Sequence, residues 1–304
     1  MNEFYLRSFC REFDYPEEAV ETLAAGLKAM EATPAMAKVL AEQLEKYVES
    51  GTDFEPNEGL KEIREHTAEV AAHPYTQELV YYILLSRHLR ELYQDAGLPY
   101  EIYYRSMCDL RYKLMECHNV YKVWGSFVAD WFCRFFNLRR FALGRLQYEP
   151  YQLSEDCHAY GKFFQKGTFC INVHIPSAGP LIPEEVEESF RLATAFFADK
   201  FEGDEVMFMC HSWLLFPEND KILPDTSRIR AFMRCFEICK EGVVRWDGDL
   251  WRIFGIEEKA DWRALMAEGK LPAETGVQKC YLKYLQSGEI PGGGLGIRFQ
   301  KKDK

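Results

Sequence analysis

Apolar residues recur at helical spacing through the first 137 positions of the chain. Two stripes each place four residues on one face of a helix: Met36, Leu40, Leu44 and Tyr47, and Tyr82, Leu85, Leu89 and Leu92. Proline and glycine interrupt the pattern at positions 34, 51–56, 74 and 97–99, where helices are expected to end. The pattern predicts a helical domain over residues 1–137, whose last helix is the aromatic-rich segment from Tyr121 to Phe136.

After Asn137 the apolar residues take the shorter spacing of strands, mixed with helical segments. The expected strands lie at 138–148, at 160–176 with a turn at Lys166-Gly167, at 205–215, in a hairpin over 243–254 that turns at Asp247-Gly248, and near 296–299. The expected helices lie at 184–198, from a cap at 225–227 to about 240, and at 273–285. These elements predict an α+β second domain over residues 138–304.

The run from Gly292 to Gly294 follows an expected helix and precedes an expected strand. A phosphate-binding loop needs the opposite order, strand then loop then helix. We therefore expect this run to be a flexible connection.

Composition and charge exclude several classes of function. The 304 residues are 47% hydrophobic, enough for two cores of ordinary size. Lysine and arginine total 37 against 48 acidic residues, so the formal net charge is −11, which does not attract nucleic acid or an anionic membrane. No apolar run reaches the ~18 residues of a membrane helix, and the N-terminus lacks the apolar core of a signal peptide. We expect a cytoplasmic protein that binds neither nucleic acid nor membrane, and its oligomeric state stays open.

Ten cysteines are spread along the whole chain without a CxxC pair. Structural zinc sites cluster their ligands at short, fixed separations. The closest approach is Cys117-His118, with no further ligand nearby. We expect no metal site and predict reduced, mostly buried thiols.

A strand, a turn and a helix follow one another from Cys170 to Phe190. Strand alternation places Asn172 and His174 on one face, at the end of the strand next to a helix N-terminus. Backbone N–H groups at such a terminus can hold an anion, so this segment is a candidate ligand site. The alternative is that His174 is a histidine with its hydrogen bonds satisfied inside the fold.

A second histidine, His211, lies near the end of the next expected strand, within MCHSWLL. Its neighbours Cys210 and Ser212 point to the opposite face, so the three side chains cannot form a triad within one strand. Because a histidine side chain titrates near neutral pH, His211 alone is a candidate general base for an amine or a hydroxyl.

Arginines and one carboxylate supply further candidates. Two arginine groups stand out from the acidic background: Arg134, Arg139, Arg140 and Arg145, and Arg228, Arg230 and Arg234. The guanidinium fork matches phosphate oxygens, and the alternative is that these arginines pair with nearby glutamates. Strand alternation also puts Glu149 at the end of a polar face, which makes it a candidate acid or base.

Three stretches of the second domain resemble a known bacterial family: LRRFALGRLQYE, INVHIPSAGPL with the EEVEESF helix after it, and MCHSWLL. That family joins a helical N-acyltransferase N-terminal domain to a GNAT-like acyltransferase domain of mixed α/β structure. The resemblance implies acyl transfer from acyl-CoA or acetyl-CoA, as co-substrate, to a small amine-type acceptor, with no metal. In GNAT domains two parallel strands splay around the pantetheine arm, and here they would be 168–175 and 205–215.

The resemblance, together with the candidates above, assigns residues to the expected site. The expected catalytic set is His174, His211, Glu149 and Tyr281. The expected cofactor-binding set is Ser177, Ala178, Gly179, Leu181, Arg228 and Arg230. Many GNAT enzymes place a tyrosine acid on the helix after the second splayed strand. Here that helix offers Phe232 and Phe236, so Tyr281 or Tyr284 would have to serve, and Tyr281 is the residue assigned.

The turn departs from the GNAT pattern. An arginine or glutamine followed two residues later by Gly-x-Gly is absent, and Pro180 and Pro183 remove two N–H donors. Glutamates in the following helix would also repel a phosphate. Beside the acyltransferase, the sequence therefore leaves open a non-catalytic module with a GNAT-like fold that binds a small molecule or a partner, and a scaffold that acts through the helical domain.

Overall fold

The computed structural model describes residues 1–302, which fold into two compact units. The first comprises Met1–Ala142 with Pro176–Ala178, and the second comprises Leu143–Ile175 and the chain from Gly179 onwards. Each unit has its own buried apolar core.

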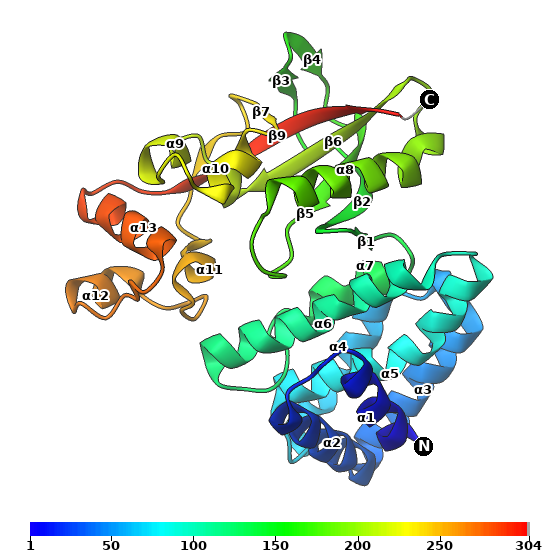
Figure 1. Ribbon diagram of the computed structural model, residues 1–304. Coiled ribbons are helices and arrows are strands. Elements are labelled where there is room, and N and C mark those ends of the chain that lie inside the picture. The colour runs from blue at the N-terminus through cyan, green and yellow to red at the C-terminus, as the bar shows by residue number, and fades with distance from the viewer. Residues whose placement is uncertain (303–304) are drawn as a thin grey trace. The chain divides into compact units, whose positions relative to one another are not determined.

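The first unit is helical. Its main helices are α1 (Asn2–Glu12), α2 (Glu17–Ala32), α3 (Pro34–Ser50), α4 (Pro56–His66), α5 (Pro74–Asp95), α6 (Tyr100–Tyr121) and α7 (Cys133–Phe136) (Figure 1). Helix α5 packs against α1, α2, α3, α4 and α6, and every residue from Thr76 to Ser86 is buried. A helix that is buried all round forms the centre of a bundle. Proline at the first position of α3, α4 and α5 starts these helices, since that N–H has no helical partner.

The predicted helix from Tyr121 to Phe136 is wrong. Helix α6 already ends at Tyr121, and Lys122 adopts the left-handed conformation at φ 58°. The chain then passes close to the backbone of Tyr75: Ser126 N donates to Tyr75 O at 3.0 Å, and a Cβ on Gly125 would lie 2.4 Å from the Tyr75 carbonyl carbon. Only α7 and the 3-10 turn Ala129–Phe132 remain helical, because this tertiary contact replaces the local helical bonds.

The second unit is built on a seven-stranded sheet in the order β1-β2-β5-β6-β9-β7, with β8 also paired to β9, and only β1 begins before the boundary at Leu143. The strands are β1 (Phe141–Leu143), β2 (Leu146–Gln152), β5 (Phe169–His174), β6 (Glu205–Ser212), β7 (Glu237–Ile238), β8 (Val244–Arg245) and β9 (Gly292–Lys301). Strands β5 and β6 are parallel, whereas β2 pairs with β5, and β6 with β9, in the antiparallel sense.

Different elements pack against the two faces of this sheet (Figure 1). Helix α8 (Pro183–Phe197) contacts β2 and β9, and its Phe190 packs edge to face on Tyr148 and Phe208. The predicted helix over 184–198 is confirmed. On the other face, a small hairpin of β3 (Cys157–Ala159) and β4 (Lys162–Phe164) contributes to a cluster that includes Met207 and Met209.

The predicted hairpin with a turn at Lys166-Gly167 is wrong. Strand β4 pairs with β3, and β5 pairs instead with β2 and β6. Gly167 N donates to Leu153 O at 2.8 Å and Leu153 N donates to Thr168 O at 3.0 Å. These bonds join the base of the hairpin to the end of β2, so the turn residues serve a longer-range contact.

The segment between β6 and β9 also differs from the sequence prediction. The helix α10 covers only Arg228–Met233, and the predicted hairpin over 243–254 is replaced by β8 and the helix α11 (Leu250–Phe254). The remaining helices are α9 (Asn219–Ile222), α12 (Trp262–Ala267) and α13 (Gly276–Gln286). Strand β9 pairs with both β7 and β8. Leu250, Ile253 and Phe254 of α11 pack in one cluster with residues of α13. These contacts with distant residues override the local preference of Asp247-Gly248 for a hairpin turn.

The expectation of a flexible connection at Gly292–Gly294 is wrong, since all three glycines are buried in β9. A Cβ on Gly292 would lie 2.1 Å from Val244 O, and one on Gly294 would lie 2.3 Å from Leu215 O. The run therefore allows close backbone approach within the sheet.

Replacing Gly294 with alanine should destabilise the protein by about 1–3 kcal/mol, because the added methyl group overpacks a backbone contact. The free energy of unfolding, measured in urea, reports this change. Gly203→Ala is the matched control, since a Cβ there meets no atom within 4 Å. Equal stability of the two variants would contradict the close approach at Gly294.

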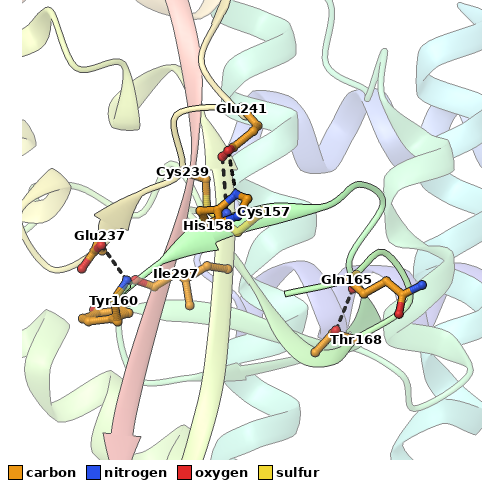
Figure 2. Close-up of a disulfide and its surroundings, with 9 residues drawn as sticks. All are labelled: Cys157, His158, Tyr160, Gln165, Thr168, Glu237, Cys239, Glu241 and Ile297. Atoms are coloured by element: carbon orange, nitrogen blue, oxygen red, sulfur yellow. Dashed lines mark hydrogen bonds and ion pairs between the residues drawn. A yellow bond between two sulfur atoms is a disulfide. The ribbon is translucent and has the colours of Figure 1, made fainter. Parts of the chain in front are cut away.

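A disulfide joins Cys157 of β3 to Cys239, which follows β7 (Figure 2). The expectation of reduced thiols is wrong for this pair, and the other eight cysteines are free. The hairpin has further anchors near it: His158 Nδ1 lies 2.8 Å from Glu241 Oε1, and Tyr160 N donates to Glu237 Oε1 at 2.6 Å. Residues 82 positions apart are thus held together by a covalent bond and by polar contacts.

Residues 1–302 show neither a metal site nor a membrane span. No group of three or more histidine, cysteine or acidic side chains in this range is arranged to hold a metal ion. No helix in it is both long enough and apolar enough to cross a membrane.

Candidate functional site

The sheet face opposite α8 carries polar side chains at the ends of β2, β5 and β6. A cavity of about 290 Å³ lies there, lined by Tyr151, Ser154, Glu155, Asn172, His174, Met209, His211 and Leu295. The two histidines singled out in the sequence therefore line one cavity. Met209 and Leu295 are nearly fully buried and form its apolar part.

The pairing of β5 and β6 ends close to this cavity. Only Ile171 with Phe208, and Asn172 with Met209, are register partners, although β5 continues to His174 and β6 to Ser212. His174 and His211 thus lie beyond the last paired residues of two neighbouring parallel strands. The backbone N–H and C=O groups of these two residues therefore do not pair β5 with β6.

His174 is paired with the carboxylate of Glu149. Its Nε2 lies 2.8 Å from Glu149 Oε1, and both side chains are largely buried, with 18% and 10% of their surfaces exposed. The antiparallel register of β2 and β5 creates the pair, because Glu149 is directly opposite Asn172 and Gln147 is opposite His174. Asn172 Nδ2 lies 3.3 Å from His174 Nε2 and 3.4 Å from Glu149 Oε1.

This pair can orient a base. A carboxylate accepts a hydrogen bond from the ring nitrogen that it faces, so the contact with Glu149 favours the neutral tautomer of His174 that has its proton on Nε2 and its lone pair on Nδ1. A histidine held in one tautomer by a carboxylate is the usual arrangement of a general base.

His211 has a different environment from His174. Its side chain is exposed, lines the cavity and makes no hydrogen bond or ion pair within residues 1–302. The adjacent Cys210 is fully buried on the face covered by α8, and burial raises the pKa of its thiol. The thiol therefore stays protonated near neutral pH, which agrees with the inference from strand alternation that no triad forms here.

An arginine in the turn between β1 and β2 supports the turn after β5. Arg145 Nη2 donates to Gly179 O at 2.7 Å, and its Nε donates to Pro180 O at 3.1 Å. Gly179 has a φ of +95°, a conformation that glycine adopts without strain. Ser177 is exposed, Ala178 is half-buried and Leu181 is buried. The sequence indicated Arg145 only as one of several basic residues, and the bonds to the turn are visible only in the structure.

Of the ten expected site residues, only His174 and His211 are in the cavity lining, and three of the others lie on α10 and α13. Tyr281 is fully buried on α13 and donates its hydroxyl to Asn219 Oδ1 at 2.5 Å. Arg230 is buried on α10, with donors directed to Asp220, Asp225 and Leu223 O at 2.8, 2.5 and 3.0 Å. Arg228 is exposed on the same helix and has no ion pair in the part of the chain that the structure describes. The sequence left two roles open for these arginines, a phosphate contact or an ion pair with an acidic side chain. In the structure Arg230 forms ion pairs with Asp220 and Asp225.

Comparisons with known proteins agree with this architecture. Residues 5–138 match the N-acyltransferase N-terminal domain, and residues 140–298 match the GNAT-like C-terminal domain. No protein with a curated description matches the sequence.

Solved structures share the fold across nearly the whole chain. An acyltransferase in complex with decanoyl-CoA and teicoplanin has a TM-score of 0.76 at 20% identity, over 96% of this chain and 87% of that one. A mutant acyltransferase in complex with octanoyl-CoA has a TM-score of 0.75 at 19% identity, over 98% and 87%. An acyltransferase with CoA and 10C-teicoplanin also has a TM-score of 0.75 at 19% identity, over 96% and 86%.

Proposed function

The chain belongs to the family defined by the GNAT-like C-terminal domain, and from this premise we propose that it transfers an acyl group from acyl-CoA to an amine. The observation that carries the proposal is the His174–Glu149 pair at the point where β5 and β6 stop pairing. The CoA complexes of the structural neighbours support acyl-CoA as co-substrate. Because acyl-CoA is a cytoplasmic metabolite, we propose that the reaction takes place in the cytoplasm.

The proposed reaction uses His174 as the general base. Its Nδ1 removes a proton from the acceptor amine as the nitrogen attacks the thioester carbonyl carbon. The C–S bond breaks as the C–N bond forms, and the His174 imidazolium gives this proton to the CoA thiolate, which leaves as CoA and returns His174 to its neutral form. Glu149 orients the imidazole and stabilises the imidazolium, while His211 lies on the neighbouring strand as a second group that exchanges protons with the acceptor.

The proposed CoA site includes the turn after β5 and the N-terminus of α8. Ser177, Ala178, Gly179 and Leu181 supply the turn, which Arg145 holds in place, and the exposed Arg228 is a candidate phosphate contact. Arg230 is not part of the proposal, because its donors are engaged within the fold. Glu184 and Glu185 occupy the first turn of α8 and oppose a phosphate, so we expect most of the affinity to come from the pantetheine arm and the acyl chain.

Thermal unfolding with added CoA compounds tests this proposal. A ligand at about 100 times its Kd stabilises the folded state by roughly 2.7 kcal/mol, so acetyl-CoA, octanoyl-CoA or decanoyl-CoA should raise Tm by several degrees. ADP, which lacks the pantetheine arm, is the control and should raise Tm much less. No shift with any CoA compound at millimolar concentration would contradict the acyltransferase and support the non-catalytic binding module.

A further inference from the structure

The charge of the cavity limits the ligand that it can accept. Its lining contains one carboxylate, Glu155, and two histidines, and no lysine or arginine of the described chain is among the lining residues. The second carboxylate close by, Glu149, is engaged with His174. The whole chain carries a net charge of −11. An anionic acceptor is therefore disfavoured here, and a cationic one is attracted.

Glu155 is the carboxylate available to such a cation. Within residues 1–302 its side chain makes no hydrogen bond or ion pair, whereas the adjacent Asp156 accepts from Lys166 N at 2.7 Å. The backbone on both sides is held in place: Leu153 is hydrogen-bonded to Thr168 and Gly167, and Cys157 forms the disulfide. The carboxylate thus projects from a fixed segment at the cavity and needs no rearrangement of the backbone to bind.

The size and the apolar part of the cavity limit the ligand further. Small-molecule pockets usually have volumes of about 300–1,000 Å³, and this cavity, at about 290 Å³, is at the lower end of that range. Met209 and Leu295 line it together with the histidines and Glu155. This lining is suited to a ligand with a short apolar middle and polar ends.

We infer that the acceptor is a short α,ω-diamine, an inference that rests on the proposed acyl transfer. One amine gives up its proton to His174 and forms the amide, and the other stays protonated and forms an ion pair with Glu155. Glu155 is therefore a specificity-determining residue for the acceptor. A monoamine with a hydroxyl in place of the second amine lacks this ion pair.

Calorimetric binding tests the inference without a need for turnover. We expect 1,4-diaminobutane to bind the wild-type chain about tenfold tighter than 4-amino-1-butanol. The difference corresponds to one charge-assisted hydrogen bond between the second ammonium group and Glu155. Glu155→Gln should remove this preference, and Glu202→Gln, which removes an exposed charge outside the cavity lining, should keep it. The preference should weaken as salt rises. Absence of a preference in the wild type, or a preference that survives in Glu155→Gln, would overturn the inference.

Acyl transfer from octanoyl-CoA separates this inference from the proposed function. In the wild type we expect a lower KM for the diamine than for the amino alcohol. Glu155→Gln should raise the KM for the diamine about tenfold and change kcat little. Selective diamine binding without any amide product would refute the acyltransferase and keep the diamine site. Equal turnover of the two amines with equal KM would refute the diamine and keep the acyltransferase.

Discussion

Replacing His174 with alanine is expected to lower kcat for acyl transfer by about 100- to 10,000-fold, the usual contribution of a general base. Its Nε2 is 2.8 Å from Glu149, which holds the imidazole in the tautomer that accepts a proton at Nδ1. The KM for acyl-CoA should change much less than kcat, because the substitution removes an interaction made in the transition state. Steady-state kinetics with an amine acceptor and octanoyl-CoA measure both quantities.

The chain offers a matched control for this experiment. His158 of the hairpin and Glu241 form another histidine–carboxylate pair with the same distance of 2.8 Å (Figure 2), and neither residue is in the cavity lining. His158→Ala should keep full activity. Glu149→Gln should lower kcat less than His174→Ala, because the base remains and only its orientation is lost. If His174→Ala and His158→Ala had the same kcat, His174 would have no role in the chemistry.

Removal of the Cys157–Cys239 disulfide is expected to lower the free energy of unfolding by about 2–4 kcal/mol. The bond closes a loop across 82 positions, and its loss gives the unfolded chain more conformational freedom. The double variant Cys157→Ala/Cys239→Ala should show this loss in urea unfolding. Wild-type protein unfolded with a thiol reductant should show a similar loss, and the double variant should not respond to the reductant.

Cys170→Ala separates the cross-link from the loss of a buried sulfur atom. Cys170 is a free, fully buried cysteine in the same hydrophobic cluster as the disulfide. Its replacement should cost only the packing of one side chain and leave the response to reductant intact. Thiol titration of the unfolded, unreduced chain should detect eight thiols, and ten after reduction. Ten thiols before reduction would show that the disulfide does not form.

The sequence by itself determined the features that depend on local periodicity. The apolar stripes of α3 and α5 and the helix at 184–198 follow from a repeat of 3.6 residues, which is a property of neighbouring positions. Strand alternation placed His174 and Asn172 on one face, and placed His211 on the same face as Met209 and opposite Cys210. Three short stretches carried the resemblance to the family, to which the chain belongs.

Only the tertiary structure decided what depends on distant partners. The pair of His174 and Glu149 needs the register of β2 against β5, and the position of Arg145 against the turn needs the same sheet. Strand β9 provides pairing for β7 and β8, which removes a locally favoured hairpin, and Cys157 finds Cys239 across 82 positions. The periodicity of a segment determines which face of a strand or helix a side chain occupies. The neighbour that this side chain contacts depends on strand order and register. Strand order and register are set by residues that are far apart in the chain, so the local pattern does not contain them.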